Sequence, residues 1–445
     1  MNKNSLTEGP ILGHTWRLTG PMLLAIVAYM SFNVVDTYFV SRLGEEQLVA
    51  ISFSFPVVMI LMNLAIGYGI GSTSVLSRLV GESRYELAKN LGSLSVALVV
   101  IFSLLLVIVG ISTTEPVFKL LGAQPEHMGY IYDYMKWAYP AMALRMIAIS
   151  ISSLFKSNGL TNIPSRAMII VAILNGILDP ILIFGYFGFP AMGIAGAGLA
   201  SFISNLLATI YEFWVGYFRF RFIQLPQRIA ETELERFKEI FSIGIPSAVA
   251  SALNPISVSI GNFLLAMVST AAVAGYGVGS KIQIFSMIPI LALSSATGPL
   301  VGQNISAKKY DRVRDIIKFV FGFAILWSIV QYALLYTLAE PIGRIFSEKP
   351  EILNTSTFYL RLVGLSLVGY SFVILTNSIL NASNQPIRAF LIILGRALIW
   401  FLVGYFIFNY FDFEQAVIWA IFFSNTVSFF FAIYQLRHFL KNTLK

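Results

Sequence analysis

The 445-residue sequence contains no cysteine, few charged residues and only three histidines. Without cysteine, the chain has no disulfide, iron–sulfur cluster or thiol chemistry. Charged residues make up 12% of the chain and hydrophobic residues 57%, which leaves too little polar surface to coat a soluble globule. The histidines lie at or beyond the ends of the apolar runs, and no HExxH, P-loop or Ser-His-Asp pattern occurs within them. These absences argue against a soluble domain and against an enzyme.

The apolar residues are gathered in long runs instead. A helix needs about 20 apolar residues to cross the hydrocarbon core of a bilayer. On that measure the sequence predicts an all-α membrane protein with twelve transmembrane helices. The first run lacks a small-residue cleavage site, so it is expected to be a retained span. The spans are predicted at residues 16–40, 48–76, 90–112, 130–154, 166–187, 191–217, 241–268, 271–297, 315–338, 357–381, 387–410 and 415–436.

The net charge of +8 reflects membrane topology and not nucleic-acid binding. Lys and Arg lie between the apolar runs, and nearly all of them fall in one set of alternate connectors. The other set contains only Arg42, Lys119, Arg344 and Lys349. Because positive residues stay inside, both termini are predicted to be cytoplasmic, in a multi-pass protein of the plasma (inner) membrane.

The two halves of the chain contain similar segments in the same order. "LVGESRYELAKN" after span two corresponds to "LVGQNISAKKYDRVRD" after span eight, and "NIPSRA" at 162–167 corresponds to "NQPIRA" at 384–389. Six spans per half put both halves in the same orientation, as parallel repeats. We therefore expect two six-helix bundles, related by a pseudo-twofold axis around a central cleft. The predicted parts are an N-lobe at 1–217, a cytoplasmic linker at 218–240 and a C-lobe at 241–445.

Ionisable residues inside spans are costly and are functional candidates by default. Asn175 and Asp179 share one face of span five, and Pro180 leaves the carbonyl of Gly176 without its usual helical donor. Counting 1.5 Å per residue from the outer span ends places Asp36, Asp179 and Ser201 at about the same depth, roughly 7–12 Å below the outer edge.

This set of two carboxylates, an amide oxygen and a hydroxyl is suited to Na⁺ or to a shared proton. We therefore predict a cation-coupling site at Asp36, Asn175, Asp179 and Ser201. The alternative is that the two acids only hold neighbouring helices together.

Other residues within the spans are open to more than one interpretation. Pro21 would bend the first helix, or would sit in its first turn and bend nothing. Arg361 lies near a span end and is expected to reach the interface. The remaining charges are expected to line the cleft or to pair across it: Arg145, Lys281 and Arg396.

The chain resembles the multidrug and toxic compound extrusion (MATE) antiporters over nearly its whole length. The specific segments are "GPMLLAIVAYMSFNVVDTYFVSRLG", "LNGILDPILIFG" and "GIAGAGLAS". The resemblance implies that Asp36, Asn175, Asp179 and Ser201 form an N-lobe cation site and that Pro21 is a bending point. Spans seven, eight and ten lack the acids that one branch carries, so the sequence is more similar to the DinF-like branch.

The resulting functional expectation is a secondary active multidrug efflux antiporter. It would export amphipathic or cationic drug-like compounds in exchange for H⁺ or Na⁺, as a monomer in the lipid bilayer and without a cofactor. The alternative is a lipid-linked oligosaccharide or polysaccharide flippase of the same superfamily, which would need a strongly cationic cleft. A membrane-embedded enzyme is disfavoured because Asp36 and Asp179 lack suitable catalytic partners.

Overall fold

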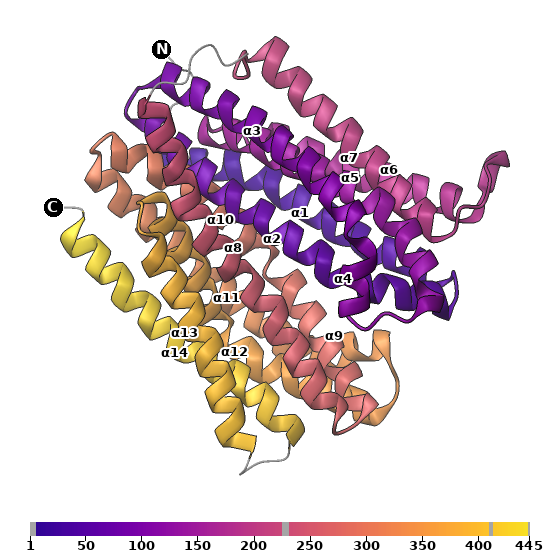
Figure 1. Cartoon of the computed structure of the whole chain (residues 1–445). Coiled ribbons are helices and arrows are strands. Elements are labelled where there is room, and N and C mark those ends of the chain that lie inside the picture. The colour runs from indigo at the N-terminus through magenta and orange to yellow at the C-terminus, as the bar shows by residue number, and fades with distance from the viewer. Residues whose placement is uncertain (1–5, 225–230, 409–412, 444–445) are drawn as a thin grey trace. The chain divides into compact units, whose positions relative to one another are not determined.

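The computed structural model describes residues 6–224, 231–408 and 413–443, and no strand occurs within them. The described residues form helices joined by short connectors (Figure 1). The prediction of an all-α protein is confirmed. Residues 225–230 of the predicted linker lie outside the described residues.

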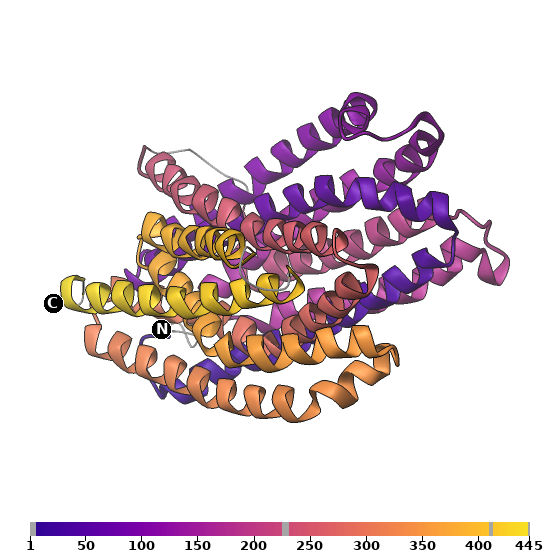
Figure 2. The ribbon, with the colours of Figure 1, turned by 90° about the horizontal axis from the view of Figure 1, so that it is seen from below.

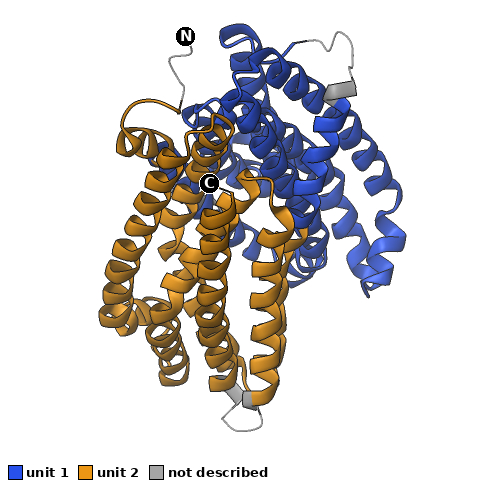
Figure 3. Ribbon diagram, turned by 90° about the vertical axis from the view of Figure 1, so that its left-hand side faces the viewer, with its two compact units in different colours: residues 1–5, 20–248 blue, residues 6–19, 249–445 orange. Residues whose placement is uncertain are grey.

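The chain forms two compact units, drawn in blue and orange in Figure 3. Unit 1 contains residues 20–248, and unit 2 contains residues 6–19 and 249–445. Two helices divide between the units, since α1 begins in unit 2 and α8 begins in unit 1. The helices of the first half are α1 (Ile11–Ser41), α2 (Glu45–Gly81), α3 (Tyr85–Ser112), α4 (Thr114–Leu120), α5 (Pro125–Ser157), α6 (Asn162–Phe184) and α7 (Ile194–Trp214), with a 3₁₀ turn at Tyr186–Gly188 and a π-helical turn at Val215–Arg219.

The second half begins with α8, whose first residues fall within the predicted linker. In Figure 2 the orange helices α11 and α12 lie side by side. The helices are α8 (Glu231–Ala266), α9 (Thr270–Ser286), α10 (Ile288–Ser306), α11 (Tyr310–Phe346), α12 (Pro350–Ala382), α13 (Pro386–Phe408) and α14 (Phe413–Asn442).

Within the described ranges, eleven helices are long and apolar enough to cross a membrane, and α9 and α10 together can form a twelfth span. The predicted eighth span at 271–297 is therefore not one straight helix: its two parts meet at an angle of 44°. The break falls at Met287, two residues before Pro289. Proline has no N–H to continue the hydrogen bonding of α9, and its ring is best accommodated in the first turn of a helix, as here in α10.

In unit 1, glycine allows α2 to approach the first part of α8 closely. A Cβ at Gly67 would collide with the backbone carbonyl of Gly244, and one at Gly71 would collide with the carbonyl of Ile240. Small residues spaced four apart allow such contact between helix backbones in membranes. The pair Gly67 and Gly71 thus fixes how these two helices pack.

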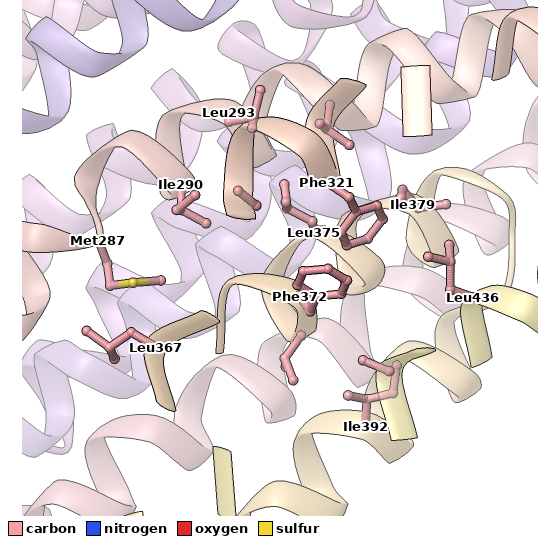
Figure 4. Packing of buried hydrophobic residues seen from close by; sticks show 14 of the residues in the cluster. Met287, Ile290, Leu293, Phe321, Leu367, Phe372, Leu375, Ile379, Ile392 and Leu436 are labelled. Carbon is pink, nitrogen blue, oxygen red and sulfur yellow. The ribbon is translucent and has the colours of Figure 1, made fainter. Parts of the chain in front are cut away.

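The core of unit 2 is built from apolar side chains of α10 to α14 (Figure 4). Phe321 of α11 and Phe372 of α12 lie with ring centroids 4.5 Å apart, and Phe372 contacts Phe429 of α14 edge-on at 4.8 Å. Other large apolar side chains are exposed on the outside, for example Ile108 of α3 and Phe401 of α13. Buried apolar packing combined with exposed apolar side chains is typical of a protein surrounded by lipid.

Candidate cation-coupling site

The four predicted coupling residues come from three helices of unit 1: α1, α6 and α7. Helix α6 ends at Gly185, whose left-handed backbone turns the chain back toward α7. The N–H groups of Met192 and Gly193 then donate to the carbonyls of Leu182 and Ile183, at 2.9 and 3.1 Å. The start of α7 is thereby fixed to the end of α6, which places Ser201 opposite Asn175.

Helix α1 packs along α6 in the same direction. In the N-terminal half of both helices, the Ser165 hydroxyl of α6 lies 3.3 Å from the sulfur of Met22 in α1. Near the C-terminal ends of both helices, Phe39 of α1 contacts the Phe184 ring of α6 edge-on at 6.2 Å. Asp36 precedes Phe39 by one helical turn, so the packing of α1 on α6 brings Asp36 beside Asp179.

A chain of hydrogen bonds joins the residues of α6 and α7. The Ser201 hydroxyl donates to the side-chain oxygen of Asn175 at 3.1 Å. The Asn175 amide nitrogen donates to a carboxyl oxygen of Asp179 at 2.8 Å, in the amide orientation that satisfies both ends of the group. The amide therefore presents a donor, and not its oxygen, to the acid.

The Asp179 and Asp36 side chains lie close enough to interact directly. Among the described residues no Lys, Arg or His forms an ion pair with either acid. Two neighbouring carboxyl groups without a cationic partner are the kind of pair that can share one proton.

The two acids differ in exposure. Asp179 is fully buried and Asn175 is 1% exposed, whereas Asp36 is only half-buried. The rest of the structure therefore covers Asp179 completely and leaves part of Asp36 uncovered.

The other predicted residues lie apart from this group. Pro21 is the eleventh residue of α1, well inside the helix and not in its first turn. Arg145 of α5 places its guanidinium 4.5 Å from the centre of the Tyr29 ring. Lys281 is exposed on α9, and Arg361 lies over the Tyr336 ring at 5.2 Å. Arg396 of α13 lies among amide and aromatic groups of unit 2.

Two polar residues of unit 1 were not singled out by the sequence. Tyr134 of α5 lies close enough to Asp36 and Asp179 to interact with both electrostatically. Glu212 of α7 is buried and accepts a hydrogen bond from the Ser152 hydroxyl at 2.7 Å. Tyr134 is one of 20 tyrosines, and Glu212 lies close to a predicted span end, so neither carried a distinct sequence signal.

Known proteins with similar sequences are transporters. The chain is 30% identical to the FAD transporter of Shewanella oneidensis over 395 residues, which is 89% of this chain and 87% of that protein. It is 28% identical to the multidrug export protein MepA of Staphylococcus saprophyticus, over 82% of this chain and 80% of that protein. The crystal structure of the Vibrio cholerae MATE transporter VcmN in the bent form is also similar, with a TM-score of 0.89 and 25% identity over 97% of this chain and 98% of that one.

The MatE family model matches residues 21–181 and 246–406, once in each half of the chain. The two matched segments contain Asp36, Asn175 and Asp179 in the first half, and their order agrees with the sequence repeat. Together with the all-helical, two-unit architecture, these matches show that the chain is a multi-pass membrane transporter of the MatE, or multidrug and toxic compound extrusion, family.

Proposed function

We propose that the protein is a proton-coupled antiporter of the plasma membrane that exports small organic compounds, with both termini in the cytoplasm. The observation that carries the proposal is the pairing of Asp36 with the buried Asp179, beside Asn175 and without an ion-pair partner among the described residues. Two neighbouring acids that share one proton are suited to load and release H⁺.

The orientation of Asn175 supports H⁺ over Na⁺ as the coupling ion. Na⁺ needs oxygen ligands, but the amide presents its N–H to Asp179 and its oxygen to Ser201. The sodium site predicted from the sequence would require this amide to turn its oxygen toward Asp179. A proton does not require this change.

In the proposed mechanism, the acid pair gains a proton from outside and loses it to the cytoplasm, through the partly exposed Asp36. The protonation state changes the charge between α1 and α6, which favours one packing of these helices over another. Proton and substrate need not share atoms, because each only has to prefer a different conformation of the transporter. Pro21 in α1 removes one helical hydrogen bond and is the proposed point of bending.

The relatives suggest small organic cargo of more than one kind. MepA proteins are named for multidrug export, which agrees with the predicted amphipathic or cationic compounds. The FAD transporter is named for a flavin dinucleotide, which carries a negatively charged pyrophosphate. We propose that this protein works as a monomer, needs no cofactor and exports compounds of this drug-like to nucleotide-like size.

Transport into proteoliposomes tests the coupling. Flavin mononucleotide (FMN) and ethidium serve as cargo, and a pH gradient or a Na⁺ gradient is imposed in separate experiments. We expect the pH gradient to drive transport of at least one cargo and the Na⁺ gradient to drive none. Asp36→Asn should abolish the response to the pH gradient, because the remaining acid can no longer share a proton.

Asp133→Asn is the matched control. Asp133 lies at the exposed end of α5, where it pairs with Lys136 at 2.6 Å. This substitution also removes one carboxylate from unit 1 but should leave coupling intact. Undiminished proton coupling in Asp36→Asn, or transport driven by Na⁺ alone, would refute the proposal.

A further inference from the structure

Arg396 brings a positive charge into the middle of unit 2. One guanidinium nitrogen donates to the side-chain oxygen of Asn254 on α8, and the other donates to that of Asn425 on α14 at 3.3 Å. The guanidinium also lies 4.6 Å from the centre of the Tyr370 ring on α12. Groups from four helices of this unit therefore meet around one arginine.

The amide groups around Arg396 are held with their oxygens toward it. The Asn254 nitrogen donates to the Tyr370 hydroxyl at 3.0 Å, and the Asn425 nitrogen donates to the Ser366 hydroxyl at 3.1 Å. Because the N–H ends of both amides are occupied elsewhere, their oxygens face the guanidinium. The surroundings fix the position and direction of the arginine head.

None of these partners carries a negative charge. The guanidinium stays protonated in proteins, and a charge within a membrane is normally paired. The ion pairs of the described part of unit 2 lie at helix ends, for example Arg344 with Glu340, and none includes Arg396. The buried Nε of Arg396 has no hydrogen-bond partner among the described residues. A donor and a full positive charge thus remain uncompensated.

The repeat places groups of opposite charge in comparable regions of the two halves. With "NIPSRA" and "NQPIRA" aligned, Arg396 falls one residue from the equivalent of Asn175, the amide of the acid pair. With the Glu-Pro pairs aligned, Tyr370 is the equivalent of Arg145, which itself lies over a tyrosine ring. The first half places two carboxyl groups beside this framework, and the second half places a guanidinium there.

We propose that Arg396, together with Asn254, Asn425 and Tyr370, binds the oxyanion group, a carboxylate or a phosphate, of the compounds that the protein exports. A guanidinium donates two parallel hydrogen bonds to such a group, which gives both strength and direction. Arg396 is half-buried, and the proposal places the ligand at the guanidinium N–H groups that do not bond Asn254 or Asn425. This inference rests on the proposed export function and narrows its cargo to organic anions.

The competing explanation is that Arg396 only ties four helices together. That role predicts a loss of stability when the arginine is removed, but no preference among ligands. Ligand selectivity therefore separates the two explanations, and a pair of ligands that differ in charge alone is required.

Riboflavin and FMN provide this pair, because they share the flavin ring and differ by one phosphate. Binding is measured by flavin fluorescence with the full-length protein in nanodiscs, with carboxymethylflavin as the carboxylate probe. We expect the native protein to bind FMN about tenfold to a hundredfold more tightly than riboflavin. The carboxylate probe should show a preference in the same direction.

Arg396→Gln should reduce the preference for FMN to about one, with riboflavin binding unchanged. Arg361→Gln is the matched control, since Arg361 also lies over a tyrosine ring in unit 2 but at its exposed side. Asn254→Asp is a second variant, which keeps the arginine and supplies an internal counter-ion. It should also abolish the preference for FMN while remaining folded.

A preference for FMN that survives in both Arg396→Gln and Asn254→Asp would overturn the inference, as would equal binding of FMN and riboflavin by the native protein. The binding assay uses no ion gradient, so it does not depend on proton coupling. Asp36→Asn should retain the preference for FMN. Failure of coupling and failure of anion recognition are thereby distinguished.

Discussion

Glu212 is a buried acid whose hydrogen bonds are only partly satisfied. It is 1% exposed, one of its oxygens accepts from the Ser152 hydroxyl at 2.7 Å, and the other has no partner among the described residues. Lys156 and Arg145 interact with it electrostatically. Removing the single hydroxyl donor should therefore be costly, because a buried carboxyl group would lose a hydrogen bond without gaining water.

We predict that Ser152→Ala lowers the free energy of unfolding by about 1–3 kcal/mol. Thermal melting of the purified protein in detergent measures the change. Ser204→Ala is the control: this serine is also buried, but its hydroxyl bonds the Ala200 carbonyl of its own helix. Equal melting temperatures for the two variants would contradict the prediction.

At the scale of residues, the sequence grouped the four residues of the candidate site but did not predict their hydrogen bonds. Depth along the spans was sufficient to group Asp36, Asp179 and Ser201, because helices have a fixed rise per residue. The sequence interpretation assigned the Asn175 amide oxygen to the cation, whereas in the structure this oxygen faces Ser201. The orientation of the amide depends on neighbours from another helix, which the sequence does not reveal. Tyr134 was missed for the same reason, because its proximity to acids on two other helices leaves no pattern in the sequence around it.

The close contact between α2 and the first part of α8 depends on glycines of α2, which have no side chain. At Gly71, a methyl group would meet the backbone carbonyl of Ile240. A backbone cannot move aside as a flexible side chain can, so the helices would have to separate. We predict that Gly71→Ala destabilises the protein by about 1–3 kcal/mol, as measured by thermal melting.

The comparison for this prediction is Gly322→Ala in α11. An added Cβ at Gly322 meets nothing within 4 Å. Alanine is also the better helix former by about 0.5–1 kcal/mol, so this variant should be as stable as the native protein or slightly more so. Comparable losses at the two glycines would show that close packing is not the cause.

At the scale of elements, hydropathy predicted which segments form membrane-spanning helices but not where a span is interrupted. The run at 271–297 is predominantly apolar, with Lys281 as its one charged residue, and its hydropathy does not distinguish one helix from two. Pro289 was the available signal, because a proline is best accommodated at a helix start. The short helix α4 lies between predicted spans, where the length criterion for spans does not apply.

At the scale of the whole molecule, the segment before α1 is fastened to unit 2. The Arg312 guanidinium of α11 donates to the carbonyls of Leu6, Glu8 and Gly9, with the Gly9 bond at 2.7 Å. Gln303 of α10 accepts from the Leu6 N–H at 3.0 Å. We call residues 6–9 the N-terminal strap.

We predict that Arg312→Ala lowers the melting temperature of the protein, because three carbonyl groups of the strap lose a charged donor. The expected loss is about 1–3 kcal/mol. Arg314→Ala changes the same residue type two positions further along α11, where Arg314 pairs with the exposed Asp311 at 2.6 Å. That variant should melt within about 0.5 kcal/mol of the native protein, and a larger effect than in Arg312→Ala would refute the prediction.

The sequence repeat predicted two similar six-span halves, and helices of both halves are present in the structure. Repetition is visible in sequence because equivalent turns need equivalent residues, such as the Asn-x-Pro segments that begin α6 and α13. The strap was not predicted, because its contacts join residues 297 to 306 positions apart. Contacts at such a separation leave no periodic pattern to detect.

The contacts of the strap can form only late in the synthesis of the chain. Residues 6–9 leave the ribosome about three hundred residues before Gln303 and Arg312 exist to receive them, so their backbone groups must find water or other partners throughout that interval. Contacts between such distant segments form late and slowly. A nascent chain halted before α10 should therefore keep its first residues open to a protease, and the completed chain should protect them.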